Sequence, residues 1–223
     1  MAKENKKNEN AEQIAAAVSK TDLFFANNKK VIIGILSAAV LVGVAIFCYV
    51  KFGYQPKIVE AQAQMAPAEA NFIAGNYETA LNGDGNDLGF VQIIEDYGSK
   101  GGKSVYLYAG ICELQLKNYV SALNYLKKYK GKDEILSARA KACEGDAYVG
   151  LEKYAEALKA YKAAAKTADN IFAASYLLKA GITAEQLGQK AEAVELYKSI
   201  KDKYPQSVEA YDIDKYITRA EAE

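Results

Sequence analysis

Glycine and alanine recur in this chain at a spacing that strongly constrains its fold. Three glycines each lie twelve residues before an alanine, and the alanines follow one another at intervals of 35 and 36 residues. The pairs are Gly110 with Ala122, Gly145 with Ala157, and Gly181 with Ala193. A fixed period of about 20 to 50 residues is typical of repeat architectures, in which each unit packs against its neighbours. We therefore expect a stack of repeated units, with small residues where paired helices approach each other.

This unit resembles the tetratricopeptide repeat, which is a pair of antiparallel helices of about 34 residues. That family places a small residue in each helix where the two come closest, with large apolar or aromatic residues around the contact. The best match here is Gly145 followed by Tyr154-x-x-Ala157-x-x-x-Tyr161. The resemblance covers roughly residues 60–205. It implies an all-α, right-handed α-solenoid of about four repeats.

The first unit is degenerate. It contains Gly75-x-Tyr77-x-x-Ala80, but a polar insertion at 82–87 follows. We expect the interrupted helix to resume from Leu88 to Tyr97, with Asp87 as its N-cap.

The last unit ends at Pro205, where the tetratricopeptide family stops its second helix. The sequence from Ser207 to Ala222 then predicts one final capping helix. A stack without such a lid leaves an apolar face in water. The apolar residues expected to cover that face are Val208, Tyr211, Ile213, Tyr216 and Ile217.

A second feature precedes the repeats. The run Val31–Val50 has 20 residues without a charge, between Lys29-Lys30 and Lys51. At about 1.5 Å per residue, it matches the ~30 Å hydrocarbon core of a bilayer. The run is apolar on all sides and follows a long polar leader, so it predicts an uncleaved transmembrane helix rather than a signal peptide.

Basic residues near the span predict its orientation. Lys20, Lys29 and Lys30 precede it, Lys51 and Lys57 follow it, and the next basic residue is Lys100. The positive-inside rule then places the N-terminus in the cytoplasm and the repeats outside. The expected parts are a cytoplasmic leader (1–30), a transmembrane helix (31–50), a juxtamembrane linker (51–59) and a repeat domain (60–223).

The resemblance to tetratricopeptide repeats also implies a concave groove lined by the first helix of each unit. An exposed apolar strip there would suit an extended or helical peptide. The alternative is that some of these side chains pack on neighbouring helices or on the lid. The expected groove residues are Leu107, Ile111, Leu114, Arg139, Asp146, Val149, Leu178, Ile182 and Glu185.

One class of groove ligand is disfavoured. Tetratricopeptide domains that clamp the C-terminal carboxylate of chaperones use Asn and Lys side chains. The matching positions for the Asn are Ile111, Asp146 and Ile182 here. This argues against a cytosolic co-chaperone.

The composition excludes several kinds of chemistry. The chain has no histidine, so it lacks Ser-His-Asp and Cys-His pairs and His-containing zinc sites. Lys+Arg and Asp+Glu both number 28, and this balance argues against nucleic-acid binding. We therefore expect no enzyme activity, no cofactor, no metal and no small-molecule substrate. Cys112 and Cys143 are either a disulfide of an oxidising compartment or two small buried apolar residues.

The order of these parts resembles the membrane-anchored ancillary subunit of the bacterial Sec translocon, the YfgM-like family. That family has a short cytoplasmic leader, one span and a tetratricopeptide-like periplasmic domain. Its leader ends in Phe-Phe-x-x-Asn just before the span. Phe24, Phe25 and Asn28 match this motif, directly before Lys29-Lys30.

The resemblance implies a non-enzymatic accessory of the Sec channel in the bacterial inner membrane. Phe24, Phe25 and Asn28 would then be membrane-proximal docking residues. The expected partners are Sec translocon subunits, a periplasmic chaperone, and unfolded or extended polypeptide. The alternative is an envelope scaffold for cell division or outer-membrane assembly.

Overall fold

The computed structural model describes the backbone of residues 2–222, and the side chains of residues 23–25 and 27–222. The chain forms two compact units, Met1–Pro56 and Lys57–Glu223. Throughout the described residues the regular elements are helices, which confirms the predicted all-α class.

The first unit holds a long apolar helix, α1 (Ala2–Cys48), and a π-helical segment (Tyr49–Tyr54). One helical stretch of the described residues is long and apolar enough to cross a membrane, by length and composition, and its most apolar part is wholly unburied. The π-helical turns come just before Pro56. A proline ring clashes with the carbonyl one α-helical turn earlier, and a wider turn relieves that clash. The Gln55 N–H accordingly donates to the Val50 carbonyl.

The second unit begins with the degenerate repeat, formed by α2 (Gln55–Ile73), α3 (Tyr77–Asn82) and α4 (Phe90–Tyr97). Ala68 of α2 and Ala80 of α3 are buried in one apolar cluster. These alanines are twelve residues apart, as are the glycine and alanine of each later repeat.

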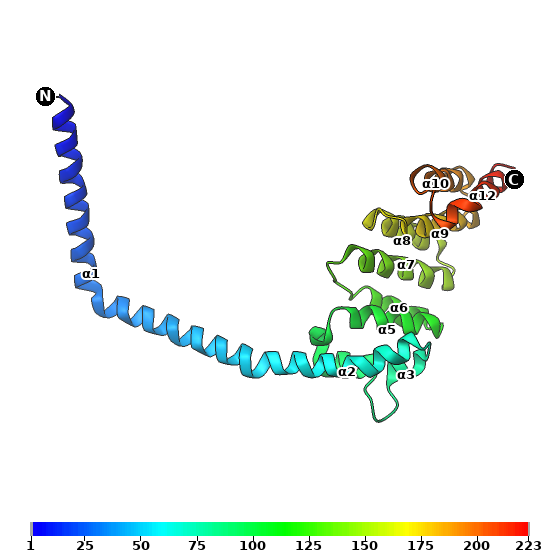
Figure 1. The fold of residues 1–223 in the computed structure, drawn as a ribbon, viewed down its shortest axis with the longest axis horizontal. Helices are drawn as coiled ribbons and strands as arrows, with labels where there is room; N and C mark the ends of the chain where they lie inside the picture. Colours follow the sequence, from blue (N-terminus) through cyan, green and yellow to red (C-terminus); the bar gives the residue numbers. More distant parts are fainter. Residues whose placement is uncertain (1, 223) are drawn as a thin grey trace. The chain divides into compact units, whose positions relative to one another are not determined.

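The structure corrects the predicted start of α4. The N-cap is Gly89 and not Asp87, and the Gly89 N–H donates to Gln92 Oε1 at 2.7 Å. The loop before it is closed by Asp84, whose carboxylate accepts the N–H groups of Asn86 and Asp87 at 2.9 and 2.8 Å. Figure 1 shows the loop between α3 and α4 projecting from the stack.

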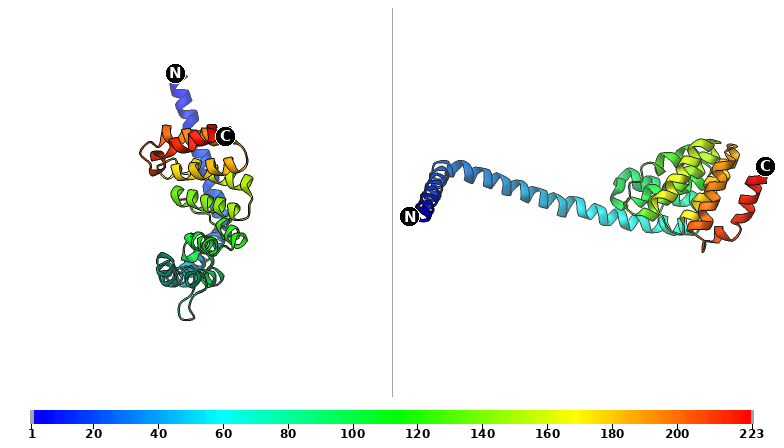
Figure 2. Two further views of the ribbon diagram at one scale, coloured as in Figure 1. Left: turned by 90° about the vertical axis from the view of Figure 1, so that its right-hand side faces the viewer. Right: turned by 90° about the horizontal axis from the view of Figure 1, so that it is seen from above.

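The next three units are helix pairs stacked in chain order (Figures 1 and 2). In each pair a short turn joins two antiparallel helices, and the second helix packs on the first helix of the following unit. The pairs are α5 (Ser104–Gln115) with α6 (Tyr119–Leu126), α7 (Glu134–Gly150) with α8 (Tyr154–Thr167), and α9 (Ala173–Gln186) with α10 (Lys190–Lys203).

The repeated glycines lie at the crossing of each pair, and the structure identifies what they face. A Cβ on Gly145 would lie 2.5 Å from Tyr161 Cε1, and one on Gly181 would lie 2.2 Å from Tyr197 Cε1. On Gly110 it would lie 2.6 Å from Leu126 Cγ. The repeated alanines are buried, but the closest neighbour of each glycine is the large residue four positions after the alanine. The glycine therefore makes room for a large side chain.

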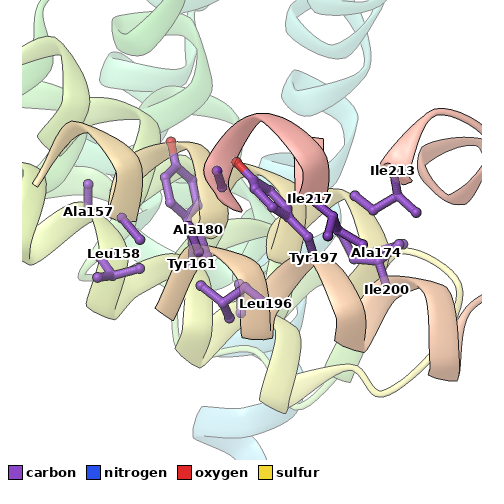
Figure 3. Close-up of a cluster of buried hydrophobic side chains, with 14 of the residues drawn as sticks. Ala157, Leu158, Tyr161, Ala174, Ala180, Leu196, Tyr197, Ile200, Ile213 and Ile217 are labelled. Atoms are coloured by element: carbon purple, nitrogen blue, oxygen red, sulfur yellow. The ribbon is translucent and has the colours of Figure 1, made fainter. Parts of the chain in front are cut away.

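One apolar cluster joins the last two units to the C-terminal helices. It contains Tyr161 of α8, Tyr197 and Ile200 of α10, and two isoleucines that follow in the chain, Ile213 and Ile217 (Figure 3). Residues far apart in the sequence thus form one core at this end of the stack.

The predicted capping helix is broken into α11 (Val208–Tyr211) and α12 (Ile213–Ala222). Val208 and Tyr211 are 89% and 93% exposed, so the expectation that they cover the last unit is wrong. The chain bends at Asp212, and α12 supplies most of the apolar side chains that pack on α10, while Ala210 of α11 packs at the edge of the same cluster. Ser207 is the N-cap of α11, and its side chain accepts the Ala210 N–H at 3.1 Å.

Candidate protein-binding face

The candidate site is the exposed side of the first helices, α5, α7 and α9, together with α12. We call it the first-helix face. Hydrogen-bonded ion pairs connect α7 to α9 and α9 to α12, and apolar side chains lie on the same helices. The residues that define the face are Leu114, Asp146, Val149, Lys179, Ile182, Glu185, Tyr216 and Arg219.

The first ion pair joins α7 to α9. Lys179 Nζ lies 2.6 Å from Asp146 Oδ1, and the Tyr161 hydroxyl donates to the same oxygen at 2.6 Å. Lys179 also lies over the Tyr161 ring, 5.7 Å from its centroid. Burial and the Asp146 charge raise the pKa of Tyr161, so its hydroxyl stays protonated and donates. Asp146 Oδ1 thus accepts hydrogen bonds from both α8 and α9.

The second ion pair joins α9 to α12. Arg219 donates two hydrogen bonds to the Glu185 carboxylate and lies 5.0 Å from the centroid of the Tyr216 ring. Bidentate Arg–carboxylate pairs fix geometry as well as charge. A surface hollow of about 490 Å³ lies here, lined by Ile182, Glu185, Gln186, Tyr216 and Arg219.

Two of the predicted groove residues do not reach this face. Leu107 and Ile111 are 1% and 5% exposed and belong to the core between α5 and α7. The facing residues of α7 in that core include Ala140 and Ala147. Because these alanines are small, the larger side chains of α5 fill the space, and they are not available to a ligand.

The other predicted residues remain candidates. Val149 and Ile182 are exposed, and so is Arg139. Leu114 and Leu178 are half-buried and pack against the core clusters below them. The sequence did not predict Lys179, Tyr216 or Arg219 as residues of the groove. The signal was present, because Asp146 to Lys179 and Glu185 to Arg219 are separated by 33 and 34 residues, close to the repeat length.

The predicted docking residues lie on α1. The side chains of Phe24 and Phe25 are exposed, and their rings meet edge to face with centroids 5.9 Å apart. Asn28 donates its side-chain N–H to the Phe24 carbonyl at 2.9 Å. Two aromatic rings are thus presented together about two turns before the uncharged run.

Cys112 and Cys143 are free and lie in different apolar clusters, so the disulfide reading is not supported. Burial raises the pKa of the Cys112 thiol to about 12 and that of Cys143 to about 11. Both are inert thiols at neutral pH. Among the side chains that the structure describes, no group of three or more His, Cys, Asp or Glu residues is arranged to hold a metal ion.

Comparison with known proteins agrees with this architecture. A family model described as tetratricopeptide repeat matches residues 144–208. No curated protein matches the chain. A solved structure described as a crystal structure of MamA is 18% identical with a TM-score of 0.53, over 70% of this chain and 92% of that one.

A second structure, described as a crystal structure of MamA protein, is 19% identical with a TM-score of 0.54, over 73% of this chain and 86% of the other. At this identity the similarity concerns the fold. With the family match and the helix pairs described above, it shows that the chain carries tetratricopeptide repeats behind a long apolar N-terminal helix.

Proposed function

We propose that this protein is a membrane-anchored, non-enzymatic scaffold that binds other proteins through its tetratricopeptide domain. The observation that carries the anchor is the unburied apolar helix. Along residues 31–50 large side chains such as Ile35, Leu36 and Leu41 are exposed on all sides. Exposing so many apolar side chains to water is unfavourable, whereas a bilayer accommodates them.

The scaffold role rests on the tetratricopeptide repeats and on the first-helix face. Repeat stacks present extended surfaces built from the same position in successive units. An anchor raises the local concentration of such a surface near membrane partners, so weak contacts become effective.

We further propose that the partner is the Sec channel, with a periplasmic chaperone and emerging polypeptide. This rests on the Phe24, Phe25 and Asn28 motif before the span. The leader would lie in the cytoplasm and the repeats in the periplasm of the bacterial inner membrane. An envelope scaffold in cell division or outer-membrane assembly is the alternative, and it would use the same face.

Site-specific crosslinking tests the partner. A photo-reactive benzoylphenylalanine at Phe24 or Phe25 in native membranes should capture Sec channel subunits. The triple substitution Phe24→Ala/Phe25→Ala/Asn28→Ala should abolish copurification of the channel. The matched control is Ile35→Ala/Leu36→Ala, which also removes exposed apolar side chains from α1 but leaves the motif intact. Capture of only division or outer-membrane assembly factors would reject the Sec reading.

Topology is tested separately with Tyr211→Cys in a Cys48→Ala/Cys112→Ala/Cys143→Ala background. Tyr211 is highly exposed, so labelling depends on the compartment and not on burial. A membrane-impermeant thiol reagent should label intact spheroplasts. Labelling only after the inner membrane is broken would place the repeats in the cytoplasm and contradict the proposed orientation.

A further inference from the structure

A furrow runs between α8 and α10, the second helices of the last two units. Both helices pack on α9, whose Leu177 and Leu187 line the space between them. In Figure 3, Leu158 of α8 and Leu196 of α10 point away from the side on which the Tyr161 hydroxyl lies, and that hydroxyl bonds to the first-helix face. The furrow is therefore a separate surface. We call it the second-helix furrow and define it by Lys159, Lys162, Lys166, Leu177, Leu196 and Lys203.

Three connected hollows make up the second-helix furrow. The first, of about 270 Å³, and the second, of about 280 Å³, share Lys162. The second shares Lys203 and Tyr204 with a third hollow of about 340 Å³. Along α8 alone the lining extends from Ala155 to Lys166, which is about 16 Å of helix. This length suits a polypeptide segment and is more than a single small anion fills.

Two side-chain contacts engage the carboxylates of the second-helix furrow. Lys162 of α8 forms an ion pair with Glu192 of α10, which crosses the furrow between the first and second hollows. The Tyr204 hydroxyl donates to Asp169 at the end of the second hollow. The two acidic side chains of the lining are thus already bound within the domain.

The other charged groups of the second-helix furrow are positive. Lys159, Lys166 and Lys203 are exposed, and among the side chains that the structure describes none of the three has an ion-pair partner. With Lys162 the lining carries four lysines against two carboxylates. Residues 57–223 as a whole hold 21 basic and 24 acidic residues. A locally positive furrow on an acidic domain favours a negatively charged ligand.

Apolar surface accompanies the lysines. Ile171 is 51% exposed and lines the third hollow beside Pro205. Leu158 and Leu196 are 7% and 9% exposed and lie recessed in the first and second hollows. The headgroups of a flat anionic bilayer would reach the lysines but not these recessed side chains. A chain with both acidic and apolar side chains reaches both, so the shape favours a polypeptide over a lipid surface.

We propose that the second-helix furrow binds an acidic polypeptide segment of a partner protein. Its carboxylates pair with Lys159, Lys166 and Lys203, and its apolar side chains enter the hollows. This inference rests on the proposed scaffold function and adds a binding surface with a stated partner chemistry. It leaves the first-helix face free for another ligand.

Fluorescence polarisation with designed peptides tests the proposal. The full chain is reconstituted in phosphatidylcholine nanodiscs, with empty nanodiscs as the blank. Three labelled peptides share a flexible Gly/Ser host, in which the first carries glutamate and leucine. The second has lysine in place of glutamate, and the third has serine in place of leucine. The Glu/Leu peptide should bind about tenfold more tightly than either of the others, and added salt should weaken its binding.

Charge reversal of the second-helix furrow supplies the second readout. Lys166→Glu/Lys203→Glu turns an excess of two positive charges into an excess of two negative ones. It should bind the Glu/Leu peptide about tenfold more weakly and the Lys/Leu peptide more tightly than the parent chain does. The matched control is Lys117→Glu/Lys132→Glu, which makes the same change of net charge at exposed lysines in the turns before α6 and α7. It should leave both affinities unchanged.

Filling the second hollow separates shape from charge. Ser199 lines this hollow and is half-buried, so the larger ring of Ser199→Tyr should occupy the space without altering the charge. This variant should lose the preference for the Glu/Leu peptide over the Glu/Ser peptide while it keeps its affinity for the latter. Circular dichroism of every variant checks that the fold is retained.

Four outcomes would overturn the inference. Equal affinity for the Glu/Leu and Lys/Leu peptides would reject charge recognition. Binding of the Glu/Leu peptide that Lys166→Glu/Lys203→Glu leaves unchanged would place its site elsewhere. Absence of binding to every peptide would reject a peptide site. Cosedimentation with phosphatidylglycerol vesicles that is lost in Lys166→Glu/Lys203→Glu, without peptide binding, would assign the furrow to a lipid surface. The scaffold proposal is judged independently, by the crosslinks from Phe24 and Phe25.

Discussion

Substitution of Gly181 by alanine is the sharpest test of the helix-pair geometry. A Cβ at this position would lie 2.2 Å from Cε1 and 2.7 Å from Cζ of Tyr197, far inside van der Waals contact. Tyr197 is fully buried, and its ring contacts that of Tyr216 at a centroid distance of 5.4 Å. The ring therefore cannot swing into solvent, and the helices α9 and α10 must move apart.

Two opposing terms set the size of the effect. Alanine is favoured over glycine in a helix interior by about 0.8–1 kcal/mol. Overpacking a core costs about 1–3 kcal/mol and sometimes more. Because the contact is so short, we expect the upper part of this range, which leaves a net loss of about 1–2 kcal/mol in the free energy of unfolding. For a chain of this size that lowers Tm by about 2–8 °C.

Thermal unfolding of the full chain in detergent, followed by circular dichroism, measures this loss. Gly150→Ala is the matched control, since a Cβ there would lie 2.4 Å from Tyr119 Cε1. Tyr119 is half-buried, so its ring has room to rotate away and the cost should be smaller. Equal melting temperatures for both variants, or a gain in Gly181→Ala, would refute the reasoning.

Other predictions concern thiols, pH and capping. At pH 8 the thiols of Cys112 and Cys143 should resist iodoacetamide in the native chain and react fully in guanidinium, as mass spectrometry will show. Their folded pKa values lie above the ordinary 9.0, so the stability they contribute is complete below pH 9 and is lost as pH rises through 11 to 12. The alkaline slope of unfolding free energy should therefore be shallower in Cys112→Ala/Cys143→Ala than in the parent chain. Asp133 Oδ1 accepts the Leu136 N–H at 2.8 Å as the N-cap of α7, and Asp133→Ala should cost about 1 kcal/mol in urea unfolding, whereas Asp133→Asn should cost little.

The repeat architecture could be predicted because its constraint is local. A helix pair can cross closely only where one helix carries a very small residue, and Gly145 and Gly181 recur at that place. The sequence did not show which side chain fills the space. Only the packed structure identifies Tyr161 and Tyr197 as the neighbours of these glycines.

The candidate face was predicted less completely because position in the repeat does not determine exposure. Ile111 has the same position relative to its repeat glycine as Ile182, which faces solvent, yet Ile111 is buried in the core beside small residues of α7. The predicted N-cap of α4, in the loop at 82–89, was wrong for a different reason. Asp87 looked like an N-cap, but the carboxylate of Asp84 accepts its N–H and shifts the start of α4 to Phe90.

The role of α12 follows from the ion pairs more clearly than from its place at the end of the chain. Asp146 and Lys179 connect the first helices of consecutive units across 33 residues, and Glu185 and Arg219 connect α9 to α12 across 34. These offsets are nearly equal, and α12 packs on α10 as α9 packs on α8, so α12 lies where the first helix of a fifth unit would lie. Its inner residues Ile213 and Ile217 close the core, while Tyr216 and Arg219 extend the first-helix face. The lid is therefore also part of the candidate site, so Arg219→Ala should reduce copurification of protein partners from native membranes more than it lowers stability, because exposed ion pairs contribute only about 0–1 kcal/mol to folding. Copurification and thermal unfolding of the same variant would separate the two effects, and a large loss of stability with unchanged copurification would assign α12 to capping alone.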